Sequence, residues 1–343
     1  MDSWNLEWDF GALKLLAQGG MLADVTLKVG AGRRVAPFYQ APWLGNGESL
    51  EPELLENLRS EFPCVPFGGT YPLHSVTQDW RAALAYEPEC GEGLFDATDE
   101  LLHGACCLGR WELMERSDTM IRIGVDYPES SIIARLERSV RCDPSAPRLS
   151  FDLDIHARSA GRRPIGIHPN LAFPKIPGNL LVEPAAFAFG AIHPAGPEAG
   201  VSRAQPGGFF DSLGEVPLAA GGTAPFDRLP FAHDTEEILQ LCGMEEGWVR
   251  LTNQEDRAAY TLTWDASIVP SLQLWISNRG RAAPPWSSRN MCLGVEPLAG
   301  VFDLGTRAGV ADNPVNARGV ATAVALDPRN PISFSYAFEA DAL

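Results

Sequence analysis

The sequence predicts a mainly β protein, built as a large antiparallel β-sandwich with few short helices. Several segments alternate apolar and polar residues with a period of two, which is typical of strands with one buried face. The 28 prolines and 33 glycines are spread along all 343 residues and interrupt the chain too often for long helices. We therefore expect two packed antiparallel sheets rather than a helical bundle.

Five segments carry the alternating pattern most clearly. In one of them Leu149, Phe151, Leu153 and Ile155 fall on the same side, so this strand is expected to bury that side in the core. The expected strands are 25–29, 121–127, 149–156, 260–264 and 272–276.

Three segments are expected to be helical. Residues 49–59 (SLEPELLENLR) begin with Ser49 as an N-cap and continue with helical spacing. Residues 235–241 open on a threonine followed by two glutamates, and residues 10–18 are a third candidate.

The domain organisation is expected to be simple. The proline- and glycine-rich stretch from about 190 to 225 is interpreted as a long excursion from the sheets, and we expect residues 1–343 to form a single domain.

The charge balance excludes several classes of partner. The chain has 27 Lys and Arg against 44 Asp and Glu, a formal net charge of −17. Such a surface repels nucleic-acid phosphates and anionic lipid, and no basic stripe or zinc-finger spacing offsets it. We expect neither nucleic acid nor membrane as a partner. A neutral small molecule, such as a sugar, meets no such barrier.

The cysteines and the apolar runs indicate a cytoplasmic protein. The seven cysteines are odd in number and none has CxxC spacing, so we expect reduced, mostly buried thiols. The first ten residues are acidic and polar, unlike a signal peptide. No apolar run approaches the roughly 20 residues that a membrane span needs.

Three places combine an ionisable side chain with Gly or Pro at the end of an expected strand. They contain His103, His168 and Glu296. Rigid strands with functional side chains at their rim are a common arrangement. A histidine taken alone is more often structural, so the argument depends on the three together. His74, followed closely by a tryptophan, is kept as the alternative to His103.

Other catalytic patterns find little support. Asp152, Asp154 and His156 share one strand face, but a solvated face explains them better than a metal site, and no metal is predicted. The sequence has no GxGxxG in a strand–helix context, no P-loop and no GxSxG motif. Nucleotide-dependent enzymes and serine hydrolases are therefore disfavoured.

Taken in order, four motifs resemble the galactose mutarotase and aldose 1-epimerase superfamily, and its hexose-6-phosphate 1-epimerase-like branch most closely. The motifs are an arginine before a proline-rich segment, a His-Gly followed by Trp-Glu, a P-x-G-x-H-P segment and an apolar strand ending in Glu-Pro. They occupy residues 59–68, 103–112, 164–169 and 292–297. The resemblance implies that family's large β-sandwich fold.

The resemblance also implies an isomerase that interconverts the α and β anomers of an aldose by opening and closing the ring. This is general acid–base chemistry, so no cofactor is expected. By resemblance, Glu296 would be the base and His168 the acid, while His103 would position the ring oxygen. Burial should raise the pKa of the Glu296 carboxyl toward neutrality.

The same resemblance implies further residues that bind the sugar. Arg59 would bind sugar hydroxyls, and Trp275 matches the family's apolar-tryptophan strand. Asp227 and Asp234 are both candidates for the family's sugar-binding aspartate, and His74 is a fifth candidate for sugar binding.

The substrate is expected to be a small sugar or a sugar phosphate, bound by a monomer or homodimer. A phosphate would need arginines at the pocket mouth, for which Arg279, Arg281 and Arg289 are available. A non-catalytic carbohydrate-binding or regulatory protein of the same fold is the alternative function. An accessory domain of a polysaccharide lyase or glycosidase is disfavoured because no catalytic companion domain is evident.

Overall fold

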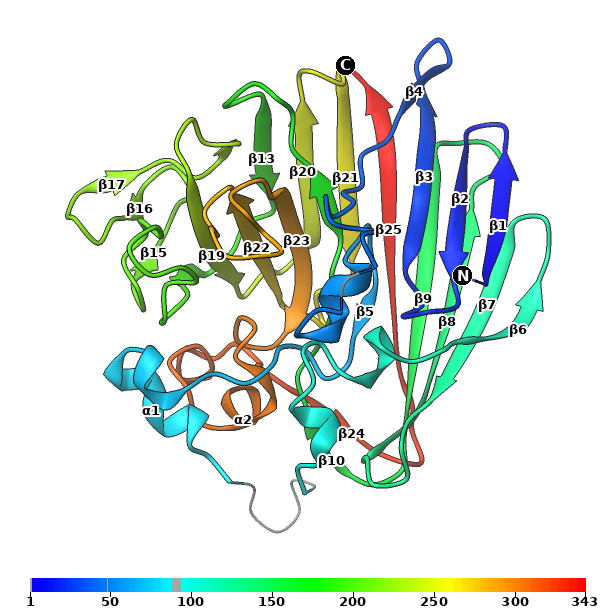
Figure 1. Cartoon of the computed structure of the whole chain (residues 1–343). Coiled ribbons are helices and arrows are strands. Elements are labelled where there is room, and N and C mark those ends of the chain that lie inside the picture. The colour runs from blue at the N-terminus through cyan, green and yellow to red at the C-terminus, as the bar shows by residue number, and fades with distance from the viewer. Residues whose placement is uncertain (1, 48, 88–93) are drawn as a thin grey trace.

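The computed structural model describes residues 2–47, 49–87 and 94–343, and this part of the chain is mainly β, as the sequence predicts. Its two largest sheets are antiparallel and face each other, and the N-terminal sheet lies beside the larger of them, in contact with β25 (Ile332–Ala342) and β7 (Met120–Asp126) (Figure 1). Together they form a β-sandwich.

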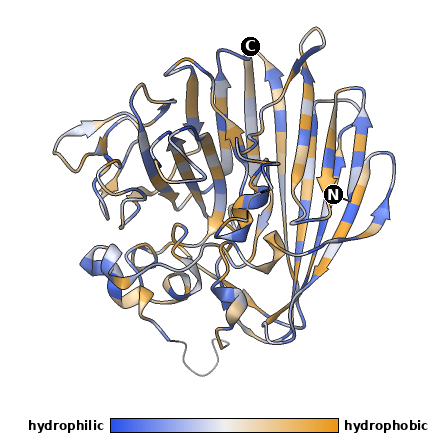
Figure 2. Cartoon of the chain, viewed as in Figure 1, coloured by the Kyte–Doolittle hydropathy of each residue, from blue (hydrophilic) through white to orange (hydrophobic). Residues whose placement is uncertain are grey.

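The largest sheet of the described residues has nine strands. The inner face of this sheet supplies much of the core. Figure 2 shows apolar and polar bands alternating along its long strands. In spatial order the strands are β18 (Arg228–Leu229), β13 (Leu180–Pro184), β20 (Gly247–Asn253), β21 (Ala258–Trp264), β25 (Ile332–Ala342), β9 (Arg148–Ala157), β8 (Ile133–Cys142), β7 (Met120–Asp126) and β6 (Glu112–Arg116).

The second sheet has eight strands within the described ranges, and it carries most of the candidate site. One of them, β12 (Asn170–Ala172), pairs with β23 away from the main order. The others, in spatial order, are β15 (Phe209–Phe210), β14 (Phe189–Ile192), β19 (Thr235–Cys242), β22 (Ser271–Asn278), β23 (Met291–Ala299), β11 (Ile165–Ile167) and β5 (Pro63–Cys64).

Smaller sheets and short helices complete the described part of the chain. The N-terminal sheet is β1 (Ser3–Trp8), β2 (Gly11–Leu16), β3 (Leu22–Val29) and β4 (Arg33–Val35), and the two-stranded sheets are β10 (Gly161–Arg163) with β24 (Val324–Leu326) and β16 (Val216–Pro217) with β17 (Thr223–Ala224). The helices are α1 (Gln78–Leu84) and α2 (Gly305–Val310), with 3-10 turns η1 (Glu53–Asn57), η2 (Leu73–Ser75), η3 (Ala97–Asp99), η4 (Ala105–Cys107) and η5 (Asn316–Arg318).

All five expected strands are confirmed, in β3, β7, β9, β21 and β22. The apolar face predicted for β9 is buried: Leu149, Phe151, Leu153 and Ile155 are all in the core. On the opposite face Asp152 and Asp154 form ion pairs with arginines of β8 and β7, so this face is the charged, solvated surface that its pattern predicts.

The helix predictions are mostly wrong. Residues 235–241 lie in β19, an interior strand with every residue buried, and a strand buried on both faces loses the period-two signal. Residues 10–18 contain β2, and residues 49–59 form only the one-turn η1. The stretch 190–225 holds short strands, including the hairpin of β16 and β17, outside the long strands of the sheets.

A buried ion pair joins the nine-stranded sheet to the segment before β5. The Arg138 guanidinium on β8 is 0% exposed, pairs with Glu61 and donates to the carbonyl of Gly20 at 2.5 Å. The Tyr336 hydroxyl on β25 donates to the other Glu61 oxygen at 2.8 Å. Both carboxylate oxygens are therefore satisfied although no water reaches them.

The thiols and helices of the described chain bear on two further expectations. Six cysteines are free and buried, as predicted, whereas Cys90 lies outside the described residues. None of the helices in the described ranges is both long enough and apolar enough to cross a membrane.

Candidate active site

His103, His168 and Glu296 line one small cavity of about 70 Å³ beside the eight-stranded sheet. The rest of its wall comes from both polar and apolar side chains of distant segments. These are Leu54, Leu55, Leu58, Leu102, Ile238, Gln273, Trp275, Arg281, Trp286 and Asp303. The three residues that the motifs single out are thus brought together, although they lie far apart in the sequence.

Glu296 is held in the middle of the sheet. It lies on β23 directly across from Gln273 of β22, whose side-chain amide donates to Oε2 at 2.6 Å. Oε1 has no hydrogen-bond partner and lies 3.4 Å from Nε2 of His168. A Cβ at Gly294 would stand 2.1 Å from Oε1, so the absence of a side chain there leaves room for the carboxylate.

The environment of Glu296 favours its protonated form. Burial raises the pKa of its carboxyl well above the ordinary value; the Gln273 hydrogen bond opposes this rise, and the charge of Asp303 adds to it. A carboxylate that acts as a base near neutral pH requires a pKa shifted in this upward direction.

His168 follows β11 and is fixed by its neighbours. Its ring stacks on Phe62 at a centroid distance of 4.9 Å, and its backbone N–H donates to the Phe62 carbonyl at 2.8 Å. Burial lowers the pKa of the imidazole well below its ordinary value, and the nearby His103 lowers it further. Nδ1 has no hydrogen-bond partner among the described residues, which leaves this polar atom available to a ligand.

His103 adopts a left-handed backbone conformation with φ of 61°. The next residue, Gly104, has φ of 81° and packs so closely that a Cβ would lie 2.0 Å from the Val65 carbonyl oxygen. The Gly68 N–H donates to Nδ1 of His103 at 3.3 Å, so the neutral ring carries its proton on Nε2. Burial lowers the pKa of His103 to about 4, while Asp303 opposes the change.

We expect His103 to make the protein less stable in acid. Its pKa is about 4 when folded against 6.5 for the free side chain, so the unfolded chain binds more protons between these values. Stability should therefore fall as the pH drops from about 6.5 toward 4, by about 2 kcal/mol from this residue between pH 7 and pH 5. Urea unfolding at both pH values measures the loss. His103→Asn, which tolerates the left-handed backbone, should show a correspondingly smaller difference, and equal differences would contradict the assignment.

Two of the other predicted residues also reach the cavity. Trp275 lines it, and its indole N–H donates to Oε1 of Glu236 at 2.7 Å. Arg281 places its Nε 3.0 Å from the same carboxylate oxygen, with the guanidinium 4.6 Å from the centroid of Trp286. Its charge is therefore already paired with a buried acid.

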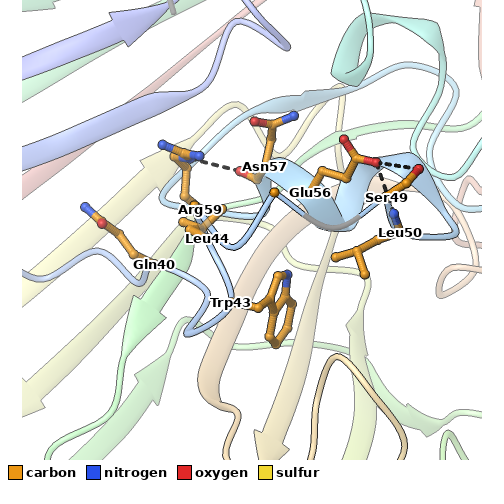
Figure 3. Close-up of a pocket in the computed structure, with 10 residues that line it drawn as sticks. Gln40, Trp43, Leu44, Ser49, Leu50, Glu56, Asn57 and Arg59 are labelled. Carbon is orange, nitrogen blue, oxygen red and sulfur yellow. Dashed lines mark hydrogen bonds between the residues drawn. The ribbon is translucent and has the colours of Figure 1, made fainter.

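Arg59 lies elsewhere. Leu54, Leu55 and Leu58 line the cavity, whereas Arg59 lines a separate pocket. There Arg59 donates to the Asn57 carbonyl at 3.0 Å (Figure 3). Leu58 and Arg59 are adjacent in the sequence and line different pockets.

The remaining candidates also stay away from the cavity. Asp234 is exposed and pairs with Arg279 at 2.7 Å, and Asp227 immediately precedes β18 at the edge of the nine-stranded sheet. His74 is exposed in η2. None of the three lines the cavity, because each belongs to a turn at a different part of the surface.

Sequence reasoning missed Gln273, Glu236 and Asp303. The first two are polar residues inside otherwise apolar strands, a signal that marks a buried polar group with a partner. Asp303 lies in a turn seven residues beyond Glu296 and had no signal of its own. As for metals, the described residues contain no group of three His, Cys, Asp or Glu side chains placed to hold one.

Comparisons with known proteins relate the chain to solved structures of one fold. No family model and no curated protein matches the chain. Among solved structures, it is similar to a putative aldose 1-epimerase from Escherichia coli K12, with a TM-score of 0.63, 14% identity and coverage of 100% of this chain and 99% of that one.

Two further structures agree. A galactose mutarotase-like protein from Lactobacillus casei has a TM-score of 0.61 and 15% identity, covering 99% of this chain and 100% of that one. A GalM/aldose epimerase homologue from C. elegans has a TM-score of 0.62 and 11% identity, covering 100% and 99%. From its sheets and these likenesses, the chain has the fold of the galactose mutarotase and aldose 1-epimerase superfamily.

Proposed function

We propose that the protein is an aldose 1-epimerase, an isomerase that interconverts the α and β anomers of a sugar. The observation that carries this proposal is the pair of His168 and Glu296, which lie 3.4 Å apart in a buried cavity. Each has one polar atom without a hydrogen-bond partner, and buried polar atoms of this kind are suited to bind a polar ligand.

Mutarotation needs one proton removed from the anomeric hydroxyl and one delivered to the ring oxygen. In our proposal Glu296 takes the first proton and His168 delivers the second, the ring opens, C1 rotates, and the two transfers reverse on closure. The raised pKa of Glu296 and the lowered pKa of His168 favour a proton on the carboxyl and a neutral imidazole. That is the protonation state of the pair while the ring is open.

His103 has a positioning role in this scheme. Because its Nδ1 accepts from Gly68, its Nε2–H is free to donate to a sugar oxygen. Its lowered pKa keeps the ring neutral near pH 7, so it orients the sugar without competing for the transferred protons.

The lining favours a neutral sugar over a sugar phosphate. Of the three arginines considered for a phosphate, Arg281 is the one that lines the cavity, and its charge is balanced by Glu236. Arg279 is paired with Asp234, and Arg289 is not part of the lining. A bound hexose also requires the leucines of residues 54–58 to shift outward, because the cavity is far smaller than the roughly 300 Å³ of common ligand pockets. The free, buried thiols support a cytoplasmic location.

NMR exchange spectroscopy on freshly dissolved α-D-glucose and α-D-galactose tests the proposal. We expect the protein to accelerate anomer exchange at catalytic concentration, with no added metal or cofactor. Unchanged exchange together with sugar-dependent shifts in the protein spectrum would instead indicate the non-catalytic carbohydrate-binding alternative.

A further inference from the structure

Asp303 places a second acid in the wall of the cavity. It lies in the turn between β23 and α2, and its side chain is 17% exposed although the histidine bound to it is fully buried. Its Oδ1 is 3.0 Å from Nε2 of His193, and its Oδ2 accepts from the Tyr71 hydroxyl at 2.7 Å. Three distant segments thus hold one carboxylate at the cavity.

The direction of the His193 hydrogen bond is fixed. The N–H of Ala195 donates to Nδ1 of His193 at 3.1 Å, so a neutral ring carries its proton on Nε2 and donates it to Asp303. Burial opposes ionisation of Asp303, but the hydrogen bonds from His193 and Tyr71 hold its pKa at about 2. Asp303 is therefore a carboxylate at any ordinary pH, whereas burial raises the pKa of Glu296.

Asp303 retains accepting capacity, whereas the other nearby acid has its oxygens engaged. Each Asp303 oxygen has one protein donor and a second lone pair. Glu236 is completely buried, does not line the cavity, and shares its oxygens among Trp275, Ser277 and Arg281. Asp303 is thus the ionised acid that a ligand can reach.

The same backbone segment ties Asp303 to His103. The N–H of Gly69 donates to the Asp303 carbonyl at 2.9 Å, and the preceding Gly68 exchanges hydrogen bonds with the backbone and ring of His103. The Asp303 carboxylate and the His103 imidazole are therefore fixed relative to each other. Two groups that orient one ligand need such a fixed arrangement.

We infer that Asp303 is a substrate-binding residue that accepts a hydrogen bond from a sugar hydroxyl away from the reacting centre and so determines which aldoses are accepted. This inference rests on the proposed function. Tyr71 and His193 act through Asp303: they keep it ionised and fix its orientation. The ligand chemistry is that of a neutral polyol ring with a free hydroxyl directed at Asp303.

The test compares Asp303→Asn with Tyr71→Phe. We expect Asp303→Asn to raise KM for the sugar about 10- to 100-fold with kcat within a few-fold, because a charge-assisted hydrogen bond made in both ground and transition states is lost. Tyr71→Phe keeps the carboxylate but removes one of the two groups that orient it, so its KM should rise by less than that of Asp303→Asn. Equal KM values for Asp303→Asn and the wild type, at matched thermal stability, would overturn the inference.

A series of monodeoxy sugars identifies the hydroxyl. One member should bind the wild type at least ten-fold more weakly than the parent sugar, yet show no such loss in Asp303→Asn. If every monodeoxy sugar loses the same amount in both proteins, Asp303 does not hold a hydroxyl. If the wild type fails to accelerate anomer exchange, the proposed function is wrong, but the sugar-binding role of Asp303 is still testable. Kd values of the sugar from NMR titration of wild type and Asp303→Asn then test that role. Equal Kd values in the two proteins, or no sugar binding at all, would then overturn the assignment.

Discussion

Glu296→Gln is expected to lower the rate of anomer exchange by about 10²- to 10⁴-fold, the range attributed to general acid–base catalysis. Glutamine preserves the size of the side chain but cannot take a proton from the anomeric hydroxyl. The amide can still accept from Gln273, and it is uncharged at a site where burial disfavours a charge, so the fold should be kept. NMR exchange spectroscopy and a thermal melt measure the two quantities.

Glu237→Gln is the matched control. Glu237 is also buried on the eight-stranded sheet, but its carboxylate accepts from the backbone N–H groups of Arg203 and Ala204 and does not line the cavity. We expect this variant to keep its exchange rate at a temperature where it is folded. Unchanged exchange in Glu296→Gln, or equal losses in both variants, would exclude Glu296 as the base.

Arg138→Met is expected to destabilise the protein by about 3–5 kcal/mol. The substitution leaves the Glu61 carboxylate buried without its cation, and an uncompensated buried charge is costly. The effect should extend to the site, because Phe62, the residue after Glu61, stacks on His168. Urea unfolding measures the loss of stability.

Arg141→Met provides a control on the same strand. Arg141 is 45% exposed and pairs with Asp152 at the surface, so its loss should cost no more than about 1 kcal/mol. Adding Glu61→Gln to Arg138→Met should recover part of the stability, because the stranded charge is then removed. Similar losses of stability in Arg138→Met and Arg141→Met would mean that burial does not determine how much the Arg138–Glu61 pair contributes to stability.

The sequence predicts those strands whose two faces lie in different surroundings, because such strands alternate apolar and polar residues. The strand with Leu149 and Phe151 has one solvated face, so its alternation identifies it. Strand β19 is buried on both faces, and its Thr235 and following glutamates, which mimic a helix start, instead satisfy buried polar contacts. No local pattern distinguishes these two situations, because burial on the second face comes from a distant part of the chain.

The same distinction holds within the site. His168 and Glu296 are recognisable because Pro and Gly stand close to them in the sequence, and His168 does follow a strand directly, whereas Glu296 lies inside β23 and not at the strand end that its motif predicts. Arg59 precedes a proline-rich segment, but the pocket that its side chain lines depends on how residues 49–59 fold. Asp303 acquires its role from Tyr71 and His193, which are remote in sequence and meet it only in the folded chain.

The lining of the cavity has a consequence for chemical self-damage. A ring-opened aldose is a free aldehyde, which condenses with amines and adds to thiols. Among the described residues that line the cavity there is no lysine and no cysteine, and its one strong cation is a guanidinium engaged with an acid. Leucine, isoleucine and tryptophan form much of the remaining wall. In the proposed reaction, an aldehyde formed there would meet no lysine or cysteine with which to form an imine or hemithioacetal, so repeated turnover would leave the protein unmodified.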